Sequence, residues 1–433
     1  MSFGWVAGVL TALLLLLMGS GIWIAVSLLG TSYLSFEMWT RAPVGNIMAT
    51  SMWGGSSSWV LTALPLFIWM GEILFRTRLS EYMFTGLAPW CRRIPGRLLH
   101  VNVGASAIFA AASGSSVAAC AAIGQMSIPE LRRQGYDDDM SFGTLAGAST
   151  LAIMIPPSIP LIIYGALAEL SVGRLFSAGV LPGLMFAAMF MAYVAGWALM
   201  HPDRIPPPGP PVSLREGILA SRRLIPILLL VIAVLGSMFF GIATATEAAA
   251  VGVVGALVLS ALTRTLTWPN FWDGLRGATR TTCVIGIIIA ACTFLNVMLS
   301  FTRAPQDLAA WVEGLRLSPY LLIAAVTVFF LVLGCLVDNI PMIAIGASLI
   351  LPMVQKAGFD PIWFGIYLVA VCEIGLITPP VGLNLFVLQR MTGKDLFYVA
   401  RVALPFFFLL NLGIVLLVIF PQIATFLPSR MSM

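Results

Sequence analysis

The chain carries one pattern of prolines and polar residues twice, 223 positions apart, within sequence that is otherwise apolar. Four of the five prolines between 129 and 182 recur at this offset, among them the pairs Pro156-Pro157 and Pro379-Pro380. The motif GYD at 135–137 recurs as GFD at 358–360. Two similar halves, each interrupted at matching places within apolar segments, are the sequence signature of a secondary transporter. We therefore predict a membrane protein made of two related halves.

The composition excludes a water-soluble globular protein. Of the 433 residues, 60% are hydrophobic and 9% are charged, and the mean hydropathy is +0.99. Apolar stretches of roughly 20 residues, enough to cross a hydrocarbon core of about 30 Å, follow one another along the chain. The net charge is only +5, and no basic stripe would suit nucleic acid. The predicted fold class is therefore an all-α polytopic protein of the lipid bilayer.

We predict two re-entrant hairpins and nine full crossings. The hairpins are 98–127 and 319–355, apolar segments that are each split near the middle by a short polar element. Irregular backbone at that depth is tolerated only where protein or a water-filled cavity covers it. Amphipathic segments at 76–93 and 303–316 adjoin the hairpins, either as arms along the membrane surface or as ordinary loop helices. The crossings are expected at 4–30, 47–75, 140–170, 175–200, 223–242, 244–263, 281–301, 362–389 and 399–425. The first of these lacks a signal-peptide cleavage site, so we expect it to be retained as a helix.

The arginines orient the two hairpins in opposite senses. Arginines flank the first hairpin on both sides, whereas basic and acidic residues mix around the second. Because Lys and Arg accumulate on the cytoplasmic side, the first hairpin should open to the cytoplasm and the second to the outside. The loop 264–280 should be cytoplasmic, the N-terminus cytoplasmic and the C-terminus periplasmic. The predicted organisation is a first inverted repeat at 1–200, a cytoplasmic linker at 201–222, extended and proline-rich over 201–214, and a second inverted repeat at 223–433.

Proline pairs should break two of the crossings. Proline lacks a backbone donor and clashes with the carbonyl one turn back, so Pro156-Pro157 should unwind 140–170 and Pro379-Pro380 should unwind 362–389. Unwound carbonyl oxygens suit a hard cation such as Na⁺, and the positive N-terminal ends of half-helices suit an anion. A single pair could be a simple kink. Two pairs at equivalent repeat positions favour a functional role.

Acidic residues in apolar segments are candidates for function because burying them in a membrane is costly. Asp338 lies at the tip of the second hairpin, where its counterpart in the first is Ser115. It could ligate an ion, receive a proton or cap the returning half-helix, and we favour capping combined with support of an ion site. Glu72, Glu247 and Glu373 could each serve an ion, or only pair with an arginine or the backbone.

Several motifs occur in an order that is typical of one family. They include PLFIWMGEIL at 65–74, FAAASGSSVAACAAIG at 109–124, IPPSIPLIIYG at 155–165, ATATEAAAVG at 243–252, LGCLVD at 333–338 and EIGLITPPVGLNLFV at 373–387. Over essentially its whole length, the chain closely resembles the large membrane subunit of tripartite ATP-independent periplasmic (TRAP) transporters, the DctM-like family. The resemblance implies an elevator-type, sodium-coupled importer of an organic acid, such as a C4-dicarboxylate or a sialic acid, in the bacterial inner membrane.

The resemblance also implies partners and site residues. The partners are a small four-helix membrane subunit, expected as a separate chain, and a soluble periplasmic substrate-binding protein. Na⁺ is the coupling ion, and no organic cofactor is expected. The residues expected to contact substrate are Ser115, Ser116, Asn339 and Asn384. The residues expected to hold sodium, between each tip and the neighbouring broken helix, are Ser113, Gly114, Ser115, Ile155, Pro156, Ser158, Val337, Asp338, Thr378, Pro379 and Gly382. Relatives often have Asp or Thr where this chain has Ala119, which favours backbone carbonyls as ligands there.

Two other hypotheses stay open. One is a self-sufficient ion or anion antiporter, or a proton-coupled carrier, of the same architectural superfamily. The other, more remote, is an intramembrane hydrolase, which would need a general base near Ser115 or Ser116. The chain has only two histidines: His201 falls in the predicted linker, and His100 lies about four helical turns from the tip. A serine hydrolase is therefore disfavoured.

Overall fold

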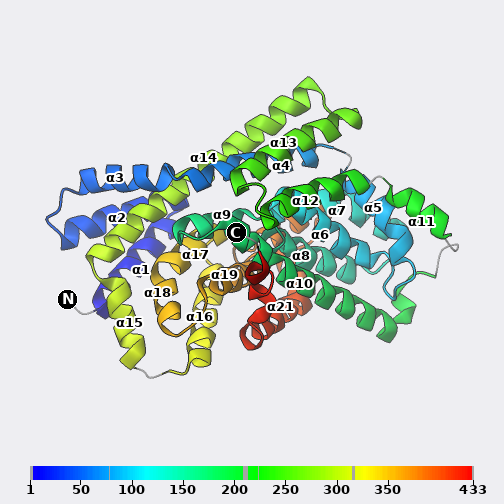
Figure 1. Cartoon of the computed structure of the whole chain (residues 1–433). Coiled ribbons are helices and arrows are strands. Elements are labelled where there is room, and N and C mark those ends of the chain that lie inside the picture. Colours follow the sequence, from blue (N-terminus) through cyan, green and yellow to red (C-terminus); the bar gives the residue numbers. More distant parts are fainter. Residues whose placement is uncertain (1–2, 78, 208–212, 223, 315–316, 432–433) are drawn as a thin grey trace.

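The all-α prediction is confirmed. The computed structural model describes the whole chain except residues 1–2, 78, 208–212, 223, 315–316 and 432–433. The described residues form helices joined by short connections, with no strand among them (Figure 1). Six of these helices are long and apolar enough to cross a membrane, or eight if two bent pairs each count as one crossing.

The helices fall into two series along the chain. The first series is α1 (Phe3–Gly19), α2 (Ile24–Trp39), α3 (Val44–Ser56), α4 (Ala63–Phe75), α5 (Leu79–Cys91), α6 (Leu99–Ser113), α7 (Ser116–Arg133), α8 (Asp138–Met154), α9 (Ile159–Leu167) and α10 (Val172–Met200). The second is α12 (Ile225–Phe239), α13 (Ala245–Leu262), α14 (Trp268–Phe301), α15 (Ala304–Gly314), α16 (Pro319–Gly334), α17 (Asn339–Ile345), α18 (Leu351–Lys356), α19 (Pro361–Gly375), α20 (Leu383–Thr392) and α21 (Leu396–Ile419). The order is completed by the short 3₁₀ turn η1 (Trp59–Thr62), by the π-helical segment η3 (Gly346–Ile350) that joins α17 to α18, and by the last elements α22 (Gln422–Thr425) and η4 (Pro428–Arg430).

The helix order recurs at the offset that the prolines show. Adding 223 to the bounds of α6, α8 and α10 gives 322–336, 361–377 and 395–423, which overlap α16, α19 and α21. By the same offset α1 and α2 correspond to α12 and α13, and α3 with α4 correspond to the single long helix α14. The correspondence therefore reaches the first helices, where the two series share no obvious motif.

The predicted crossing at 4–30 is wrong as a single helix. The chain turns at residues 20–23, and α1 and α2 pack against each other. Gly21 has a φ of 80° and its N–H bonds back to Met18 O at 3.0 Å, a left-handed ending that helices commonly use. The run Gly19-Ser20-Gly21 is a weak signal within an apolar stretch, so the sequence suggests one long helix. Both the total of nine crossings and the side given to the N-terminus depended on this segment.

The predicted loop at 264–280 is wrong as well. Helix α14 begins at Trp268 and continues for 34 residues. The hydroxyl of Thr267 caps it by accepting a hydrogen bond from Asn270 N at 3.3 Å, and Pro269 lies in the first turn, where proline fits a helix. Polar residues in the first turns lower the local hydropathy without ending the helix. Arg280 therefore lies well inside α14.

The linker 201–222 is partly helical. It contains a short turn, η2 (Pro202–Arg204), and helix α11 (Leu214–Ser221), while residues 208–212 of the predicted extended segment lie outside the described residues. Helix α11 packs against α5, where Trp90 Nε1 donates a hydrogen bond to Ser221 Oγ at 2.7 Å. The end of the linker is thereby attached to the helix that precedes the first hairpin.

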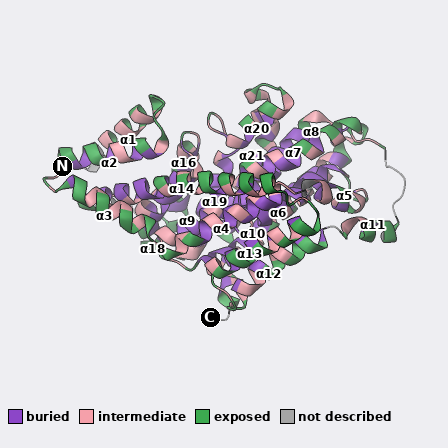
Figure 2. Ribbon diagram, turned by 90° about the horizontal axis from the view of Figure 1, so that it is seen from above, coloured by how far each residue is buried: buried purple, intermediate pink, exposed green. Residues whose placement is uncertain are grey.

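The helices pack as two groups that are in contact at the hairpin tips and along α12. In the frame group, α1–α4 and α12–α14, helix α4 packs against α13 and α14, and α14 also runs along α2 and α3. In the hairpin group, α6–α10 and α16–α21, helix α8 packs against α6, α7, α19 and α21. The groups touch at the tips, where α4 meets α6 and α14 meets α17, and also where α4 meets α9 and α12 meets α6 and α10. Figure 2 shows that burial is greatest in the middle of the molecule.

Helix α8 is buried on every side. All residues from Met140 to Met154 are buried, and two glycines allow α21 to approach closely. A Cβ added to Gly143 would come within 2.4 Å of Val402 O, and one added to Gly147 within 2.5 Å of the Phe406 ring. Close approach at small residues is typical of helix packing within membranes. This rigid centre holds the broken helix α8–α9 in place.

Candidate functional site

The first predicted hairpin is a helix, a sharp turn and a helix. Helix α6 ends at Ser113, Gly114 takes a left-handed conformation with φ 61°, and α7 begins at Ser116. Glycine adopts such a φ without strain, which explains its place at the reversal. Ser115 caps α7, because its Oγ accepts a hydrogen bond from Ala118 N at 3.4 Å. The second arm continues to Arg133, beyond the predicted end at residue 127.

The first tip lies directly against the break between α8 and α9. A Cβ added to Gly114 would come within 2.8 Å of the carbonyl oxygen of Pro157, so only glycine allows this approach. The break itself occurs at the predicted residues, Ile155–Ser158. The hydroxyl of Ser158 spans it by donating to Ile153 O and accepting from Leu161 N at 3.4 Å.

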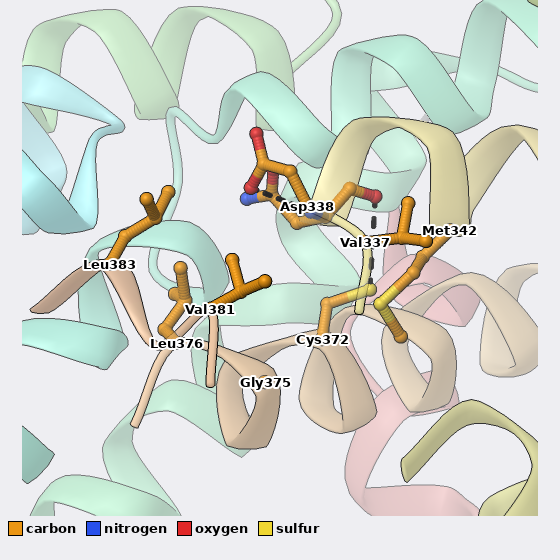
Figure 3. A pocket seen from close by; sticks show the side chains of 9 residues that line it. Val337, Asp338, Met342, Cys372, Gly375, Leu376, Val381 and Leu383 are labelled. Atoms are coloured by element: carbon orange, nitrogen blue, oxygen red, sulfur yellow. Dashed lines mark hydrogen bonds between the residues drawn. The ribbon is translucent and has the colours of Figure 1, made fainter. Parts of the chain in front are cut away.

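The second tip repeats this arrangement with a carboxylate. Asp338 caps α17, because its Oδ1 accepts a hydrogen bond from Asn339 N at 2.7 Å, so the predicted capping role is confirmed. Beside it, the second broken helix ends at Gly375 and resumes at Leu383. A cavity of about 10 Å³, the space of about one water molecule, lies between the two. Figure 3 shows Val337 and Asp338 on one side of this cavity, and Cys372, Gly375, Leu376, Val381 and Leu383 on the other.

The residues predicted to hold sodium fall into two groups, one for each tip. Gly114 lies against Pro157, which stands between the predicted Pro156 and Ser158. Val337 and Asp338 line the small cavity beside the second break, and Thr378, Pro379 and Gly382 are not among its lining residues. Two of the hydroxyls already serve the backbone: Ser158 as above, and Thr378, whose Oγ1 donates to Ile374 O at 2.6 Å. Within the described part of the chain, no three His, Cys, Asp or Glu side chains are grouped as metal ligands. The remaining oxygen atoms that could bind Na⁺ are mainly those of backbone carbonyls.

Ser116 and Asn384 connect the first tip to the second broken helix. The Nδ2 of Asn384 donates to Ser116 Oγ at 2.7 Å and lies 3.0 Å from Ser149 Oγ on α8. Both Ser116 and Asn384 are buried. Asn384, predicted to contact substrate, therefore lies behind Ser116 and positions its hydroxyl.

A larger cavity, of about 310 Å³, lies between the two tips. Residues 114–117 of the first tip and 338–340 of the second line it, so the predicted substrate residues Ser115, Ser116 and Asn339 share one space. The first residues of α9 and α20 line it as well, at Ile159 and Leu383. The starts of α7, α9, α17 and α20 therefore converge on a single cavity.

Helix α14 of the frame group forms a further wall of this cavity, which the sequence analysis missed. Its lining residues are Arg280, Thr281, Val284, Ile285 and Ile288. Their spacing follows one face of a helix. The same spacing, continued from the apolar segment back to Arg280, is the signal that could have placed this arginine in the helix.

The other acids in apolar segments have structural partners. Glu72 pairs with Arg76 at 3.0 Å. Glu247 forms a capping box with Thr244 at the start of α13. Glu373 is fully buried on α19, with Thr150 as its hydrogen-bond partner.

Neither histidine faces the tip serines. His100 lies at the start of α6, with its Nε2 next to the carbonyl oxygen of Pro95, and His201 follows α10 and stacks on Trp197. Ser115 and Ser116 therefore have no histidine to act as a general base.

Comparison with known proteins decides the family. Residues 10–423 match the family described as tripartite ATP-independent periplasmic transporter, DctM component. The chain belongs to the DctM family. It is 35% identical to the C4-dicarboxylate TRAP transporter large permease protein DctM of Pseudomonas aeruginosa, over 89% of this chain and 90% of that one. It is 30% identical to the sialic acid TRAP transporter large permease protein SiaM of Vibrio cholerae, over 92% of each chain.

A solved structure supports the fold. The YdaH transporter of Alcanivorax borkumensis, reported to have an unusual topology, superposes with a TM-score of 0.60 over 87% of both chains. At 13% identity, this likeness concerns the fold alone. As a DctM-family protein the chain is a large permease subunit, a polytopic membrane transporter component and not an enzyme.

Proposed function

We propose that this DctM-family chain imports a small organic acid, driven by an inward Na⁺ gradient, as the permease subunit of a tripartite system in the bacterial inner membrane. The named relatives are permeases for C4-dicarboxylates and sialic acid, so these acids are the first substrates to test. A separate small four-helix membrane subunit would join it in the membrane. A periplasmic binding protein would deliver the acid.

The observation that carries this proposal is the convergence of half-helix starts on the cavity between the tips. Helices α7, α9 and α20 point their N-terminal ends, at Ser116, Ile159 and Leu383, toward this space. The N-terminal end of a helix carries partial positive charge and free N–H groups, which favour an anion. Discontinuous helices that present such ends to an anionic substrate are a recurring feature of secondary transporters.

The sodium proposal rests on the two tip–break contacts. Na⁺ prefers oxygen ligands, and unwound helix segments supply backbone carbonyls that no longer bond within a helix. Pro157 O lies against Gly114 in the first half, and the small cavity beside Asp338 occupies the equivalent place in the second. Asp338 supplies a carboxylate where the first half has Ser115. The second site would therefore attract a cation more strongly than the first.

The helix bounds revise the proposed topology. With α1 and α2 as separate crossings, each half contributes five crossings and one re-entrant hairpin. Five is odd, so the second half is inverted relative to the first, and both termini lie on the same side. The basic flanks of the first hairpin then favour a periplasmic N-terminus, on the same side as the C-terminus. In this arrangement the hairpin group would move as the elevator against the frame group.

Reconstitution tests the function directly. The chain is placed in proteoliposomes with the small subunit, and uptake of succinate and of N-acetylneuraminate is measured with the cognate binding protein and an imposed Na⁺ gradient. We expect uptake of one acid that needs both the binding protein and sodium. Equal uptake in sodium-free buffer would replace sodium with protons, and uptake without the binding protein would favour a self-sufficient carrier.

A further inference from the structure

Arg280 is the cation of the frame group that faces the cavity between the tips. It lies on α14, among apolar lining residues of the same helix face, Val284, Ile285 and Ile288. Two nearby arginines are already engaged: Arg276 lies 3.8 Å from Asp273, and Arg76 bonds Glu72 at 3.0 Å. In the described part of the chain, no ion pair or hydrogen bond of the Arg280 side chain is found.

The charges that line this cavity are asymmetric. Asp338 is the acidic residue of its lining, on the hairpin side, and Arg280 is the basic one, on the α14 side. A bound carboxylate is repelled by Asp338 and attracted by Arg280, so its acid group is directed toward α14. The remainder of the molecule then faces the tip hydroxyls and amides of Ser115, Ser116 and Asn339.

We propose that Arg280 binds the carboxylate of the transported acid and makes the cavity selective for acids over neutral analogues of the same size. The inference rests on the proposed function, since it assumes that an organic acid enters this cavity. A guanidinium can hold a carboxylate through two parallel hydrogen bonds, and it carries a full positive charge. Arg280 is exposed, so its guanidinium is accessible to an acid that enters the cavity.

The contact between Arg280 and a bound acid should also depend on the conformation of the transporter. Helix α14 packs along α2, α3 and α4, whereas the tip residues belong to the hairpin group. An acid that bonds Arg280 and the tips together bridges the two groups. The contact is available only while the tips lie beside Arg280, so it acts on binding in this conformation and not throughout the transport cycle.

The test compares two arginines one turn apart on α14 in the complete reconstituted transporter. We expect Arg280→Gln to raise KM for succinate or N-acetylneuraminate, whichever the wild type transports, by about tenfold or more, the loss typical of a charged hydrogen bond. Arg280→Lys, which keeps the charge but loses the paired geometry, should fall between Gln and wild type. The matched control Arg276→Gln removes an exposed charge that has its own partner, and its KM should stay within about twofold of the wild-type value.

A chemical rescue separates charge from folding. Arg280→Cys is made with Cys283→Ala, because Cys283 is exposed on the same helix. Attaching a positively charged ethylammonium group to this thiol should lower KM again, whereas a negatively charged ethylsulfonate should not. Equal KM values for wild type, Arg280→Gln and both modified thiols would overturn the role of Arg280. A wild-type transporter that takes up neither acid would instead overturn the proposed function, before any variant is compared.

Discussion

The hydroxyl oxygen of Thr150 lies 3.4 Å from Oε2 of Glu373, and the two residues are 223 positions apart, one repeat. They stand on α8 and α19, which are equivalent by the same offset and pack against each other. In a two-fold arrangement, only residues on the axis meet their own counterparts. In the proposed inverted arrangement, this contact would lie on the axis that relates the two halves.

Glu373 should tolerate the loss of its charge better than the loss of its shape. It is fully buried, and its Oε1 has no hydrogen-bond partner in the described structure. Glu373→Gln keeps the contact with Thr150 and removes a carboxylate that is costly to bury, so thermal unfolding in detergent should occur at the wild-type temperature or higher. Glu373→Ala should lose about 2 kcal/mol or more, because it leaves a cavity. An alanine variant as stable as wild type would argue against tight packing at the axis.

Gly114 should be far less replaceable than another glycine of similar backbone conformation. Gly114 and Gly135 both have positive φ, at 61° and 81°. An added Cβ meets Pro157 O at 2.8 Å in the first case and open space in the second. Gly135→Ala should therefore cost only the backbone strain, about 1 kcal/mol, and keep uptake. Gly114→Ala should also separate the tip from the broken helix and raise the sodium concentration for half-maximal uptake. Equal effects of the two substitutions would remove the tip–break contact from the proposed mechanism.

Ser116 and Asn384 should be energetically coupled. Removing either side chain leaves a buried partner without its hydrogen bond, which costs about 1–3 kcal/mol. A double-mutant cycle of Ser116→Ala and Asn384→Ala, measured by unfolding, should give a coupling energy of about 0.5–3 kcal/mol. The cycle of Ser115→Ala with Asn384→Ala is the control. Since Ser115 bonds Ala118 N instead, its effect should add simply. Strict additivity in both cycles would contradict the contact.

Labelling of single cysteines should reveal the inverted arrangement. In a background without the exposed Cys283, Arg93→Cys and Arg133→Cys should react with an impermeant maleimide only from the cytoplasmic side, and Asp307→Cys and Asp360→Cys only from the periplasmic side. Ser20→Cys, in the turn between α1 and α2, should react from the cytoplasm if these helices are separate crossings. Reaction of both flanking pairs from one side would exclude inverted halves.

Strong local signals made the tips and the breaks predictable from sequence. Two consecutive prolines disrupt a helix, and the breaks at Ile155–Ser158 and Leu376–Gly382 contain those pairs. The GSS sequence likewise predicted the reversal at Gly114, and Asp338 its capping role. These features depend on a few adjacent residues, so no knowledge of distant contacts was needed.

Features that depend on context were missed. The turn at Gly21 is signalled only by the short run Gly19-Ser20-Gly21. The polar start of α14 resembles a loop until its neighbours α2, α3 and α4 are in place. A loop at the start of α14 also hides Arg280, because a loop residue is not expected to line a cavity inside the protein. The bond between Ser116 and Asn384 joins residues 268 positions apart, and no local pattern indicates it.

That bond also limits how the protein can be divided. The hydroxyl at the first tip is held by an amide that is synthesised only near the end of the chain, and the same amide lies next to Ser149. During synthesis, the hydrogen bond of Ser116 with Asn384 can therefore form only after α20 has been made. Two fragments separated within 201–222 would each lack part of the first tip until they associated. Although the two halves have matching helices, the first half cannot complete its tip without the second.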